Sequence, residues 1–565
     1  MIPRQPPNLS RLSLAITLAL SATGAFAQTR PDIGDALRQV PAPLAPPTAP
    51  VPQLGGVTEA KPPMTALTTG PTVVVKKVEV TGNRVIAAAT LHALVADAEG
   101  QPQTLAQLED LATRITRHYR AAGYFVARAY IPEQEVSNGV VVIRVIEGNY
   151  GQFILKNNSL VRDGTVQGLL DNVKDRDIVS LDTLERAMLI INDTPGVQVV
   201  RADVMPGQAV GTSDFAVDTV AGPRANGYVT LDNYGSLYTG KERLSFGADW
   251  NSPTGRGDRL SASGLLTDHT DLTNGRLAYS ALLASNGTRG ELAFSQTNYA
   301  LTDTFEPLDA VGRARSVSLN FSTPLKRTRN QTVELGLSLV NNDLLDEVRA
   351  TNTSTPKRSH SVTGTLSSSA EHSFLGAFGL TQANAAFSLG NLDIKTDADR
   401  ALDAAGAQTQ GKFAKVQLGL SRTTLLPKTF QLLTSLKAQW ALSHKNLDGS
   451  ERMSISGIGG VMAFPSGESS GDNAALARIE LSRPLPVIGG VQLSVSAFTD
   501  YGWARAASPT PGTSDRELSD VGLGISGKWR GAFFRIEVAN QQAGGPAVSE
   551  PFPSTKVLAQ AGWSF

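Results

Sequence analysis

The chain has 565 residues, 51 basic and 51 acidic side chains, six histidines and no cysteine. The balanced charge argues against binding to nucleic acid. The absence of cysteine excludes disulfides, thiol nucleophiles and cysteine-ligated metals, and no histidines are paired at metal-ligand spacing. A chain of this length is expected to form several domains rather than one hydrophobic core.

The first 27 residues have the pattern of a secretory signal peptide. Arg4 and Arg11 precede an apolar run at residues 12–20, and Ala25-Phe26-Ala27 matches an A-x-A cleavage site. The run is too short to span a membrane as a helix, which needs about 20 residues. The sequence therefore predicts an exported mature chain, and a retained anchor is the alternative.

Two short segments follow the predicted cleavage site. Residues 28–40 are expected to form a short amphipathic helix, with Ile33 and Leu37 on one face. Residues 41–71 are rich in proline, so they are expected to act as a semi-rigid linker without a core.

Two small modules are predicted next, at residues 72–148 and 149–223, each with the order β-α-α-β-β. In the first, Thr104 is expected to cap the longer helix and Gly123 to end it. Its predicted strands are residues 73–80, 125–131 and 139–147, with a short helical piece at 91–94. The second has predicted strands at 151–155, 197–205 and 211–220 and helices at 163–170 and 181–191. Each sheet is expected to leave an open edge at which an extended peptide could add as a strand.

From residue 224 to residue 565 apolar and polar residues alternate with period two. Alternation alone fits either a soluble sandwich or an outer-membrane β-barrel. The length allows roughly sixteen strands at about 20 residues per strand and connection. The chain ends within a strand that carries Trp563 and Phe565, which favours the barrel. These two aromatics are predicted to form the barrel's C-terminal targeting signal, and membrane-interface aromatics are the simpler interpretation.

This organisation resembles the outer-membrane transporters of two-partner secretion, the TpsB family of haemolysin activator/secretion proteins of the ShlB/FhaC/HecB type. The family belongs to the BamA-like superfamily, and the modules resemble its POTRA domains. The matching motifs cover most of the mature chain: residues 119–124, 129–132, 145–148, 184–187, 192–197, 206–207, 231–235 and 257–258.

The resemblance also implies a pore-loop motif that folds back into the barrel. The motif residues are Gly460, Val461, Met462, Ala463, Phe464, Pro465, Gly467 and Glu468. The matching inward strand motif is Phe498, Asp500 and Gly502, and its alternation with Val495 independently predicts that Phe498 and Asp500 face the lumen. An ordinary extracellular loop is the alternative.

One residue departs from the family pattern. Met462 occupies the place of the loop arginine that would pair with the strand aspartate, so Asp500 needs another cation or water. Arg452, Arg478 and Arg505 are candidates. We expect the loop to dock all the same, with Met462 and Phe464 packed on Phe498.

The sequence supports no catalytic site, metal site or cofactor. Residues 467–471 match the G-x-S-x-G pattern, but a strand rather than a helix is predicted after them, which disfavours a serine hydrolase. No P-loop motif occurs.

The resemblance implies an outer-membrane pore of a Gram-negative bacterium, with its modules in the periplasm. It would secrete a large TpsA-type adhesin or haemolysin without nucleotide hydrolysis. Its expected partners are that secreted protein, outer-membrane lipid and, during biogenesis, the barrel assembly machinery. The alternative is a BamA-like factor that inserts other barrels; a passive porin and a membrane enzyme are less consistent with the sequence.

Overall fold

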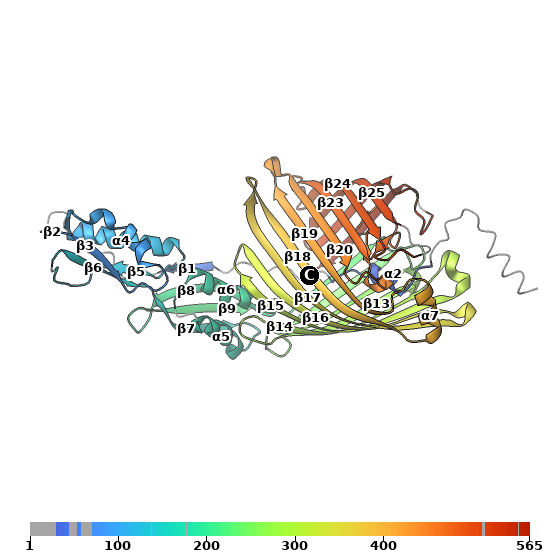
Figure 1. Cartoon of the computed structure of the whole chain (residues 1–565), viewed down its shortest axis with the longest axis horizontal. Coiled ribbons are helices and arrows are strands. Elements are labelled where there is room, and N and C mark those ends of the chain that lie inside the picture. The colour runs from blue at the N-terminus through green and yellow to red at the C-terminus, as the bar shows by residue number, and fades with distance from the viewer. Residues whose placement is uncertain are drawn as a thin grey trace, which may run out of the picture.

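A computed structural model describes residues 30–43, 53–57, 71–136, 138–175, 178–510, 515–551 and 553–565. The predicted signal peptide and most of the predicted linker lie outside these residues. The modules lie in a row at one end of the molecule and a large barrel forms the other end (Figure 1). No helix among the described residues is both long enough and apolar enough to cross a membrane.

The first module packs two helices on a small sheet. Its elements are β2 (Thr72–Val74), β3 (Lys77–Thr81), α3 (Ala88–Ala93), β4 (Pro102–Thr104), α4 (Leu105–Ala121), β5 (Arg128–Tyr130) and β6 (Val140–Ile146). Thr104 caps α4 as predicted, in a reciprocal capping box with Gln107. The single strand predicted at 73–80 is wrong: Val75 donates its N–H to Gln101 and Lys76 to Gly139, which separates β2 from β3. The strand predicted at 125–131 is shortened because Phe125 and Val126 pack on the core of the second module.

The second module contains β7 (Asn149–Asn158), α5 (Asp163–Asp171), α6 (Leu181–Asn192), β8 (Val197–Pro206) and β9 (Thr212–Ala221). Its sheet has the order β1-β8-β9-β7, in which β1 is Gln53–Val57 from the linker and runs parallel to β8. The linker was predicted to be a spacer, and this prediction is wrong at residues 53–57, because β1 pairs with the β8 edge. At the other side of the sheet, β7 is the edge strand.

The second module is docked on three periplasmic turns of the barrel. Arg162 donates its N–H to Gly255 in the first turn, and Ile190 lies against Gly287 in the second. At the third turn, Arg327 forms a two-pronged ion pair with Asp193, at 2.7 and 2.9 Å. This module therefore contacts the rim from β11 to β16, six of the sixteen barrel strands in the described part of the chain.

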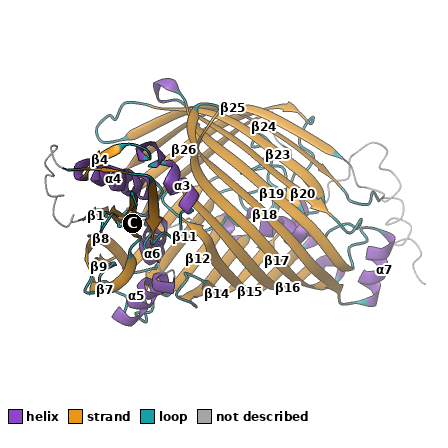
Figure 2. Ribbon diagram, turned by 60° about the vertical axis from the view of Figure 1, so that its left-hand side comes forward, coloured by secondary structure: helices purple, strands orange, loops and turns teal. Residues whose placement is uncertain are grey.

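In the described part of the chain, sixteen antiparallel strands close into a barrel in sequence order, as predicted. They are β10 (Ala225–Asp232), β11 (Arg243–Asn251), β12 (Arg259–Thr267), β13 (Leu272–Leu282), β14 (Arg289–Ala300), β15 (Ala310–Arg327), β16 (Gln331–Val348), β17 (Thr353–Phe374), β18 (Ala377–Ile394), β19 (Gly411–Leu425), β20 (Gln431–Ala441), β23 (Asn473–Pro484), β24 (Gln492–Arg505), β25 (Arg516–Trp529), β26 (Ala532–Ala543) and β27 (Thr555–Ser564). Figure 2 shows the long, tilted strands β14–β20 that build one wall. The ring closes between β10 and β27, where Gly227 and Phe565 exchange backbone hydrogen bonds of 2.9 and 3.0 Å.

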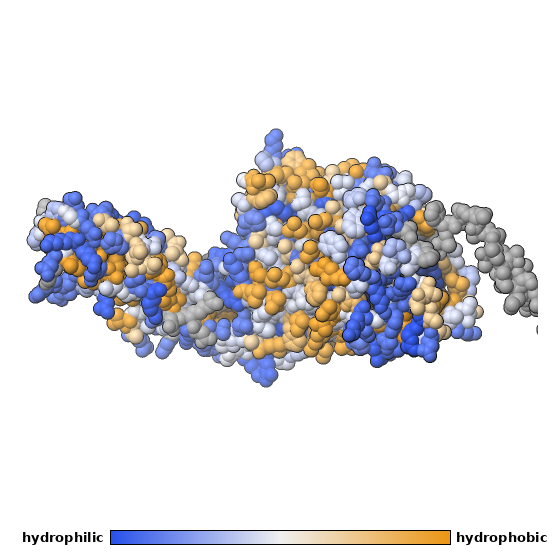
Figure 3. All heavy atoms as spheres, viewed as in Figure 1, coloured by the Kyte–Doolittle hydropathy of each residue, from blue (hydrophilic) through white to orange (hydrophobic). Residues whose placement is uncertain are grey.

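The two faces of the barrel wall differ in chemistry. Large apolar side chains such as Leu231, Leu292 and Leu523 are 57–68% exposed on the outer face. Hydrophobic residues gather over this outer face (Figure 3), whereas Asp232, Asp346 and Asp500 face inward and are buried. This pattern fits a wall with lipid outside and a polar lumen inside.

The lumen contains two segments of the same chain. One is α2 (Ile33–Gln39), which lies inside the barrel (Figure 1) against β14, β15 and β16. The other is the loop between β20 and β23, which carries the short paired strands β21 (Met453–Ser454) and β22 (Ser470–Gly471). The remaining helix, α7 (Asp397–Ala405), lies in the extracellular connection between β18 and β19. Short 3₁₀ turns are η1 (Ala96–Ala98), η2 (Asn172–Asp175), η3 (Asp268–Thr270), η4 (Asp303–Leu308), η5 (Arg349–Thr351), η6 (Pro427–Thr429) and η7 (Gly449–Glu451).

Candidate functional site

The predicted pore loop folds back into the lumen. Its tip, from Val461 through Pro465, is buried, and Ile455 and Val461 hold its turn together with a 2.8 Å backbone hydrogen bond. Gly460 is buried at the same turn, whereas Gly467 is exposed, with φ of +88°. An apolar tip of this kind is stable in a polar lumen only where it finds an apolar surface.

The loop tip divides its side chains between two apolar clusters. Met462 and Ala463 pack with Phe498, Tyr234 and Leu558. Phe464 instead belongs to a cluster with Leu476 and Leu518. The prediction that Met462 packs near Phe498 agrees with this placement, but the same prediction for Phe464 does not, because the chain turns between the two residues.

Two strand glycines make room for these contacts. A Cβ atom at Gly502 would lie 3.0 Å from Ile455 and 3.4 Å from Val461, so the loop packs directly on this part of β24. A Cβ atom at Gly522 would overlap the Phe498 ring. The predicted motif residue Gly502 therefore provides space rather than a contact of its own.

The backbone of the loop tip is held by a residue that the sequence analysis did not single out. Asp520 on β25 accepts the N–H of Ala463 at 2.7 Å and that of Asp500 at 3.2 Å. Gln541 on β26 donates to the carbonyl of Ala463 at 3.2 Å. Asp520 occupies an inward-facing position of β25 and pairs with Asp500 in the strand register. The alternation of inward and outward positions along β25 is the sequence signal that could have identified Asp520.

Arg478 is the cation that pairs with Asp500. Its Nη1 lies 3.0 Å from Asp500 Oδ2, and its guanidinium lies over the Phe498 ring, 4.2 Å from the centroid. The same arginine also forms ion pairs with Glu480 and Glu537, at 2.8 and 3.2 Å. The other two candidates pair elsewhere: Arg452 with Asp472, and Arg505 with Asp515 and Glu517.

Glu468 connects the pore loop to the extracellular loop that follows β26. Its side chain is fully buried, pairs with Arg516 and accepts the N–H groups of Val548 and Ser549 at 3.0 and 2.8 Å. A buried carboxylate of this kind is stabilised by the cation and by several N–H donors. Glu468 thus holds the pore loop against the extracellular mouth of the barrel.

Both ends of the lumen helix α2 are hydrogen-bonded to the barrel. At its start, Ile33 donates its N–H to Asp346, at 2.9 Å, and Tyr299 donates to the same carboxylate at 2.7 Å. At its end, Arg243 donates to the carbonyl of Gln39, at 2.6 Å. A carboxylate at the first turn and a cation at the last turn both stabilise the helix through their interaction with its dipole.

The start of α2 lies in a crowded acidic environment. Burial raises the pKa of Asp32 to about 6, and the nearby carboxylates of Asp35, Asp346 and Asp448 act in the same direction. Arg38 acts in the opposite direction. Lys357 lies 2.9 Å from Asp448 and neutralises part of this charge.

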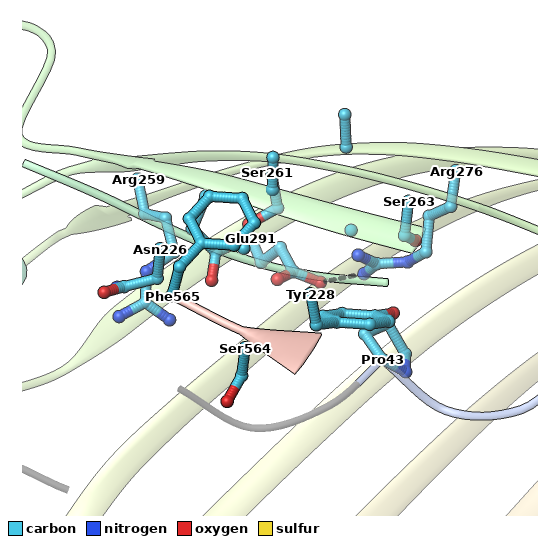
Figure 4. Close-up of a pocket in the computed structure, with 15 residues that line it drawn as sticks. Pro43, Asn226, Tyr228, Arg259, Ser261, Ser263, Arg276, Glu291, Ser564 and Phe565 are labelled. Carbon is cyan, nitrogen blue, oxygen red and sulfur yellow. Dashed lines mark hydrogen bonds and ion pairs between the residues drawn. The ribbon is translucent and has the colours of Figure 1, made fainter. Parts of the chain in front are cut away.

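A cavity of about 360 Å³ lies where the linker leaves α2. Pro43 borders it together with Tyr228 on β10, and the ion pair between Arg276 and Glu291 forms part of its wall (Figure 4). Phe565 also lines this cavity. Pro43 therefore lies beside the strand pair that closes the barrel.

The described residues contain no cluster of histidine and carboxylate side chains that could hold a metal ion. Ser469, the serine of the G-x-S-x-G pattern, lies in the stalk of the pore loop, where its backbone bonds Ile455 and Ser456. The arrangement is suited to closing a pore.

The C-terminal aromatics lie at the end of the closing strand and are exposed. Trp563 and Phe565 are 53% and 59% exposed, and their ring centroids are 5.1 Å apart. Their role as an assembly signal stays a prediction.

Engineered cysteine pairs test the position of the loop tip. The chain has no natural cysteine, so any cross-link comes from the introduced pair. A short bifunctional thiol reagent is expected to join the M462C/F498C pair and the F464C/L518C pair, since each pair shares one cluster. The F464C/F498C pair is the matched control and is expected to react poorly. Equal cross-linking of all three pairs, or none at 462 and 498, would contradict this position.

The acidic environment of α2 predicts a pH-dependent plug. The pKa of Asp32 is about 6 in the docked helix and ordinary, near 3.8, once the helix is released. The docked state therefore binds the proton more tightly, so docking is strongest at acid pH and weakens as pH rises from about 4 to 6. The difference between these two pKa values corresponds to about 3 kcal/mol.

Planar-bilayer conductance of the full chain is expected to rise over this pH range. D32N retains an N-cap residue but removes the charge, so it is expected to lower the conductance at neutral pH and flatten its pH dependence. D163N, at the exposed first turn of α5, is the control. An unchanged pH profile in D32N would show that Asp32 does not govern docking.

Comparison with known proteins agrees with this architecture. A family model for the haemolysin secretion/activation protein ShlB/FhaC/HecB matches residues 211–527, and one for the ShlB-type POTRA domain matches residues 73–148. The heme/hemopexin transporter protein HuxB of Haemophilus influenzae strain 86-028NP is 30% identical over 433 residues, 76% of each chain. The outer membrane transporter CdiB of Escherichia coli is 26% identical over 468 residues, 80% of this chain and 76% of CdiB.

Two solved structures share the fold. CdiB from Escherichia coli superposes with a TM-score of 0.73 at 23% identity, covering 90% of this chain and 94% of its own. CdiB from Acinetobacter baumannii superposes with a TM-score of 0.63 at 15% identity, covering 99% and 97%. The predicted family, fold class and outer-membrane location are confirmed. The chain belongs to the ShlB/FhaC/HecB family of haemolysin secretion/activation proteins, outer-membrane β-barrel transporters with periplasmic POTRA domains.

Proposed function

We propose that this transporter exports one large TpsA-type adhesin or haemolysin from the periplasm to the cell surface. The observation that carries the proposal is a polar lumen filled by two segments of the same chain, α2 and the pore loop. A passive porin needs neither a lumen helix nor modules docked beneath its rim. Both segments are attached to the barrel by contacts that the chain can exchange for solvent.

The second module offers a place for the partner to bind. β1 pairs with the β8 edge through its backbone, as Gln53 faces Arg201 and Leu54 faces Ala202 in parallel register. Backbone pairing of this kind accepts many sequences, so an extended partner segment could use the same edge. A partner that displaced β1 would release residues 53–57 from the sheet of the second module.

Export needs no nucleotide in this scheme. The partner would enter the lumen as an extended chain after the helix and the loop shift. Its folding outside the cell would remove it from the return equilibrium and make transport directional. Partner binding can shift the equilibrium from a closed state to an open state only if the free energies of the two states differ by a few kcal/mol.

Deleting the gene for this chain tests the proposal against the barrel-assembly alternative. The deletion is expected to abolish surface display of one large exported protein, such as the product of an adjacent reading frame, while the levels of other outer-membrane barrels stay unchanged. The measurements are surface proteolysis of the partner and heat-modifiable gel mobility of the resident porins. Restoration by the intact gene is the control. A general loss of folded barrels with normal partner display would support assembly activity instead.

A further inference from the structure

The periplasmic rim of the barrel has two halves with different surroundings. The second module covers the turns after β11, β13 and β15. Within the described residues, no module contact is recorded at the turns after β17, β19, β23 and β25. The turns after β17 and β23 have apolar tips: Leu375, Val487 and Ile488 are 90%, 65% and 67% exposed. Exposed apolar tips beside a lipid-facing wall belong in the interfacial layer of the bilayer.

Three arginines on this free half each lie over an aromatic ring. Arg422 lies 5.5 Å from the Phe374 centroid, Arg483 lies 5.1 Å from that of Phe430, and Arg530 lies 5.6 Å from that of Trp529. Strand register places Arg422 and Arg483 on the same outer face as Leu420 and Leu481, which are 51% and 41% exposed. The three cations therefore lie at the periplasmic edge of the lipid-facing surface.

The charge on this half is one-sided. We call Arg422, Lys428, Arg483 and Arg530 the arginine rim. Among the described residues, the outward-facing positions in the periplasmic halves of β17–β25, and the turns that join them, contain no aspartate or glutamate. Glu371, three residues before Phe374, and Glu480, three residues before Arg483, face the lumen by strand register. A row of cations without counter-ions at the headgroup level attracts anionic lipid.

Arg483 and Arg530 have free donors for a ligand. Arg422 is occupied, because it donates to Thr381 Oγ1 at 2.6 Å and to the carbonyl of Ala377 at 3.0 Å. Within the described residues, Arg483 and Arg530 are exposed and their only recorded partners are the rings beneath them. A guanidinium stacked on a ring keeps its N–H edge free to bind phosphate oxygens.

We propose that the arginine rim binds the phosphates of anionic glycerophospholipids in the periplasmic leaflet, through Arg483 and Arg530. The apolar tips of the adjacent turns contact the acyl chains, while the stacked rings hold each guanidinium at headgroup depth. Bound lipid would fix the free half of the rim in the bilayer, opposite the half that the second module holds. Free inorganic phosphate and a lipid headgroup present the same phosphate oxygens to the arginines. The exposed apolar tips of the adjacent turns favour a lipid as the ligand, because only a lipid has acyl chains for them to contact.

Native mass spectrometry of the full chain tests this site. The protein is released from micelles containing phosphatidylglycerol and phosphatidylcholine, and the retained lipids are counted. Wild-type protein is expected to enrich phosphatidylglycerol. R483Q/R530Q is expected to lower that enrichment by about thirtyfold, equivalent to about 2 kcal/mol at about 1 kcal/mol per cation. R128Q/R144Q removes two positive charges from the first module, which does not contact lipid. This control variant is expected to leave the enrichment of phosphatidylglycerol unchanged.

Three outcomes would overturn the proposal: unchanged enrichment in R483Q/R530Q, an equal loss of phosphatidylcholine, or displacement of the lipid by inorganic phosphate. The last would identify a simple anion site. Heat-modifiable mobility checks that the barrel is folded. Should the double variant fail to fold, each single variant is measured instead, with about a fivefold loss expected from each.

Discussion

In hydrocarbon, an unpaired backbone N–H or C=O group costs several kcal/mol, and this cost forces the sheet to close on itself. The last strand, β27, meets the first, β10, and the terminal residue Phe565 completes the ring with two backbone bonds to Gly227. Closure leaves an apolar outer face and a lumen lined with polar groups. A barrel of this size encloses an aqueous channel unless something fills it. The lumen helix and the pore loop fill it from within the same chain.

Apolar burial and hydrogen bonds hold both lumen segments. The pore loop buries Val461, Met462 and Phe464, and Asp520 fixes its backbone. The helix buries Ile33 and Ala36 in an apolar cluster of barrel side chains, and both of its ends are hydrogen-bonded to the barrel. Carboxylates surround the start of the helix, so its attachment also depends on their protonation.

The substitution at position 462 has a consequence for movement. With a methionine in the loop, the cation for Asp500 comes from Arg478 on the neighbouring strand. Both partners of this buried pair belong to the barrel wall. Movement of the loop would therefore leave the pair between Arg478 and Asp500 intact, whereas Asp520 would lose its bond to Ala463 and Glu468 its pair with Arg516.

The sequence predicted the barrel and the modules because period-two and period-3.6 alternation report burial directly. It could not place α2, because a seven-residue helix has the same pattern in solution and in a lumen. It missed β1, although residues 53–57 contain no proline and can therefore donate to a sheet ladder. It also misplaced Phe464, since the direction of a side chain in a glycine-rich turn depends on tertiary contacts. Asp520 carries no local signal beyond its inward parity, and only the folded loop shows what it binds.

The central claim, a lumen closed from within, is tested most directly by the conductance of the intact protein in a planar bilayer without partner. The account predicts a small conductance for the full mature chain and a much larger one when residues 30–43 are removed, with the barrel still heat-modifiable. A full chain that already conducts like the shortened one would contradict it.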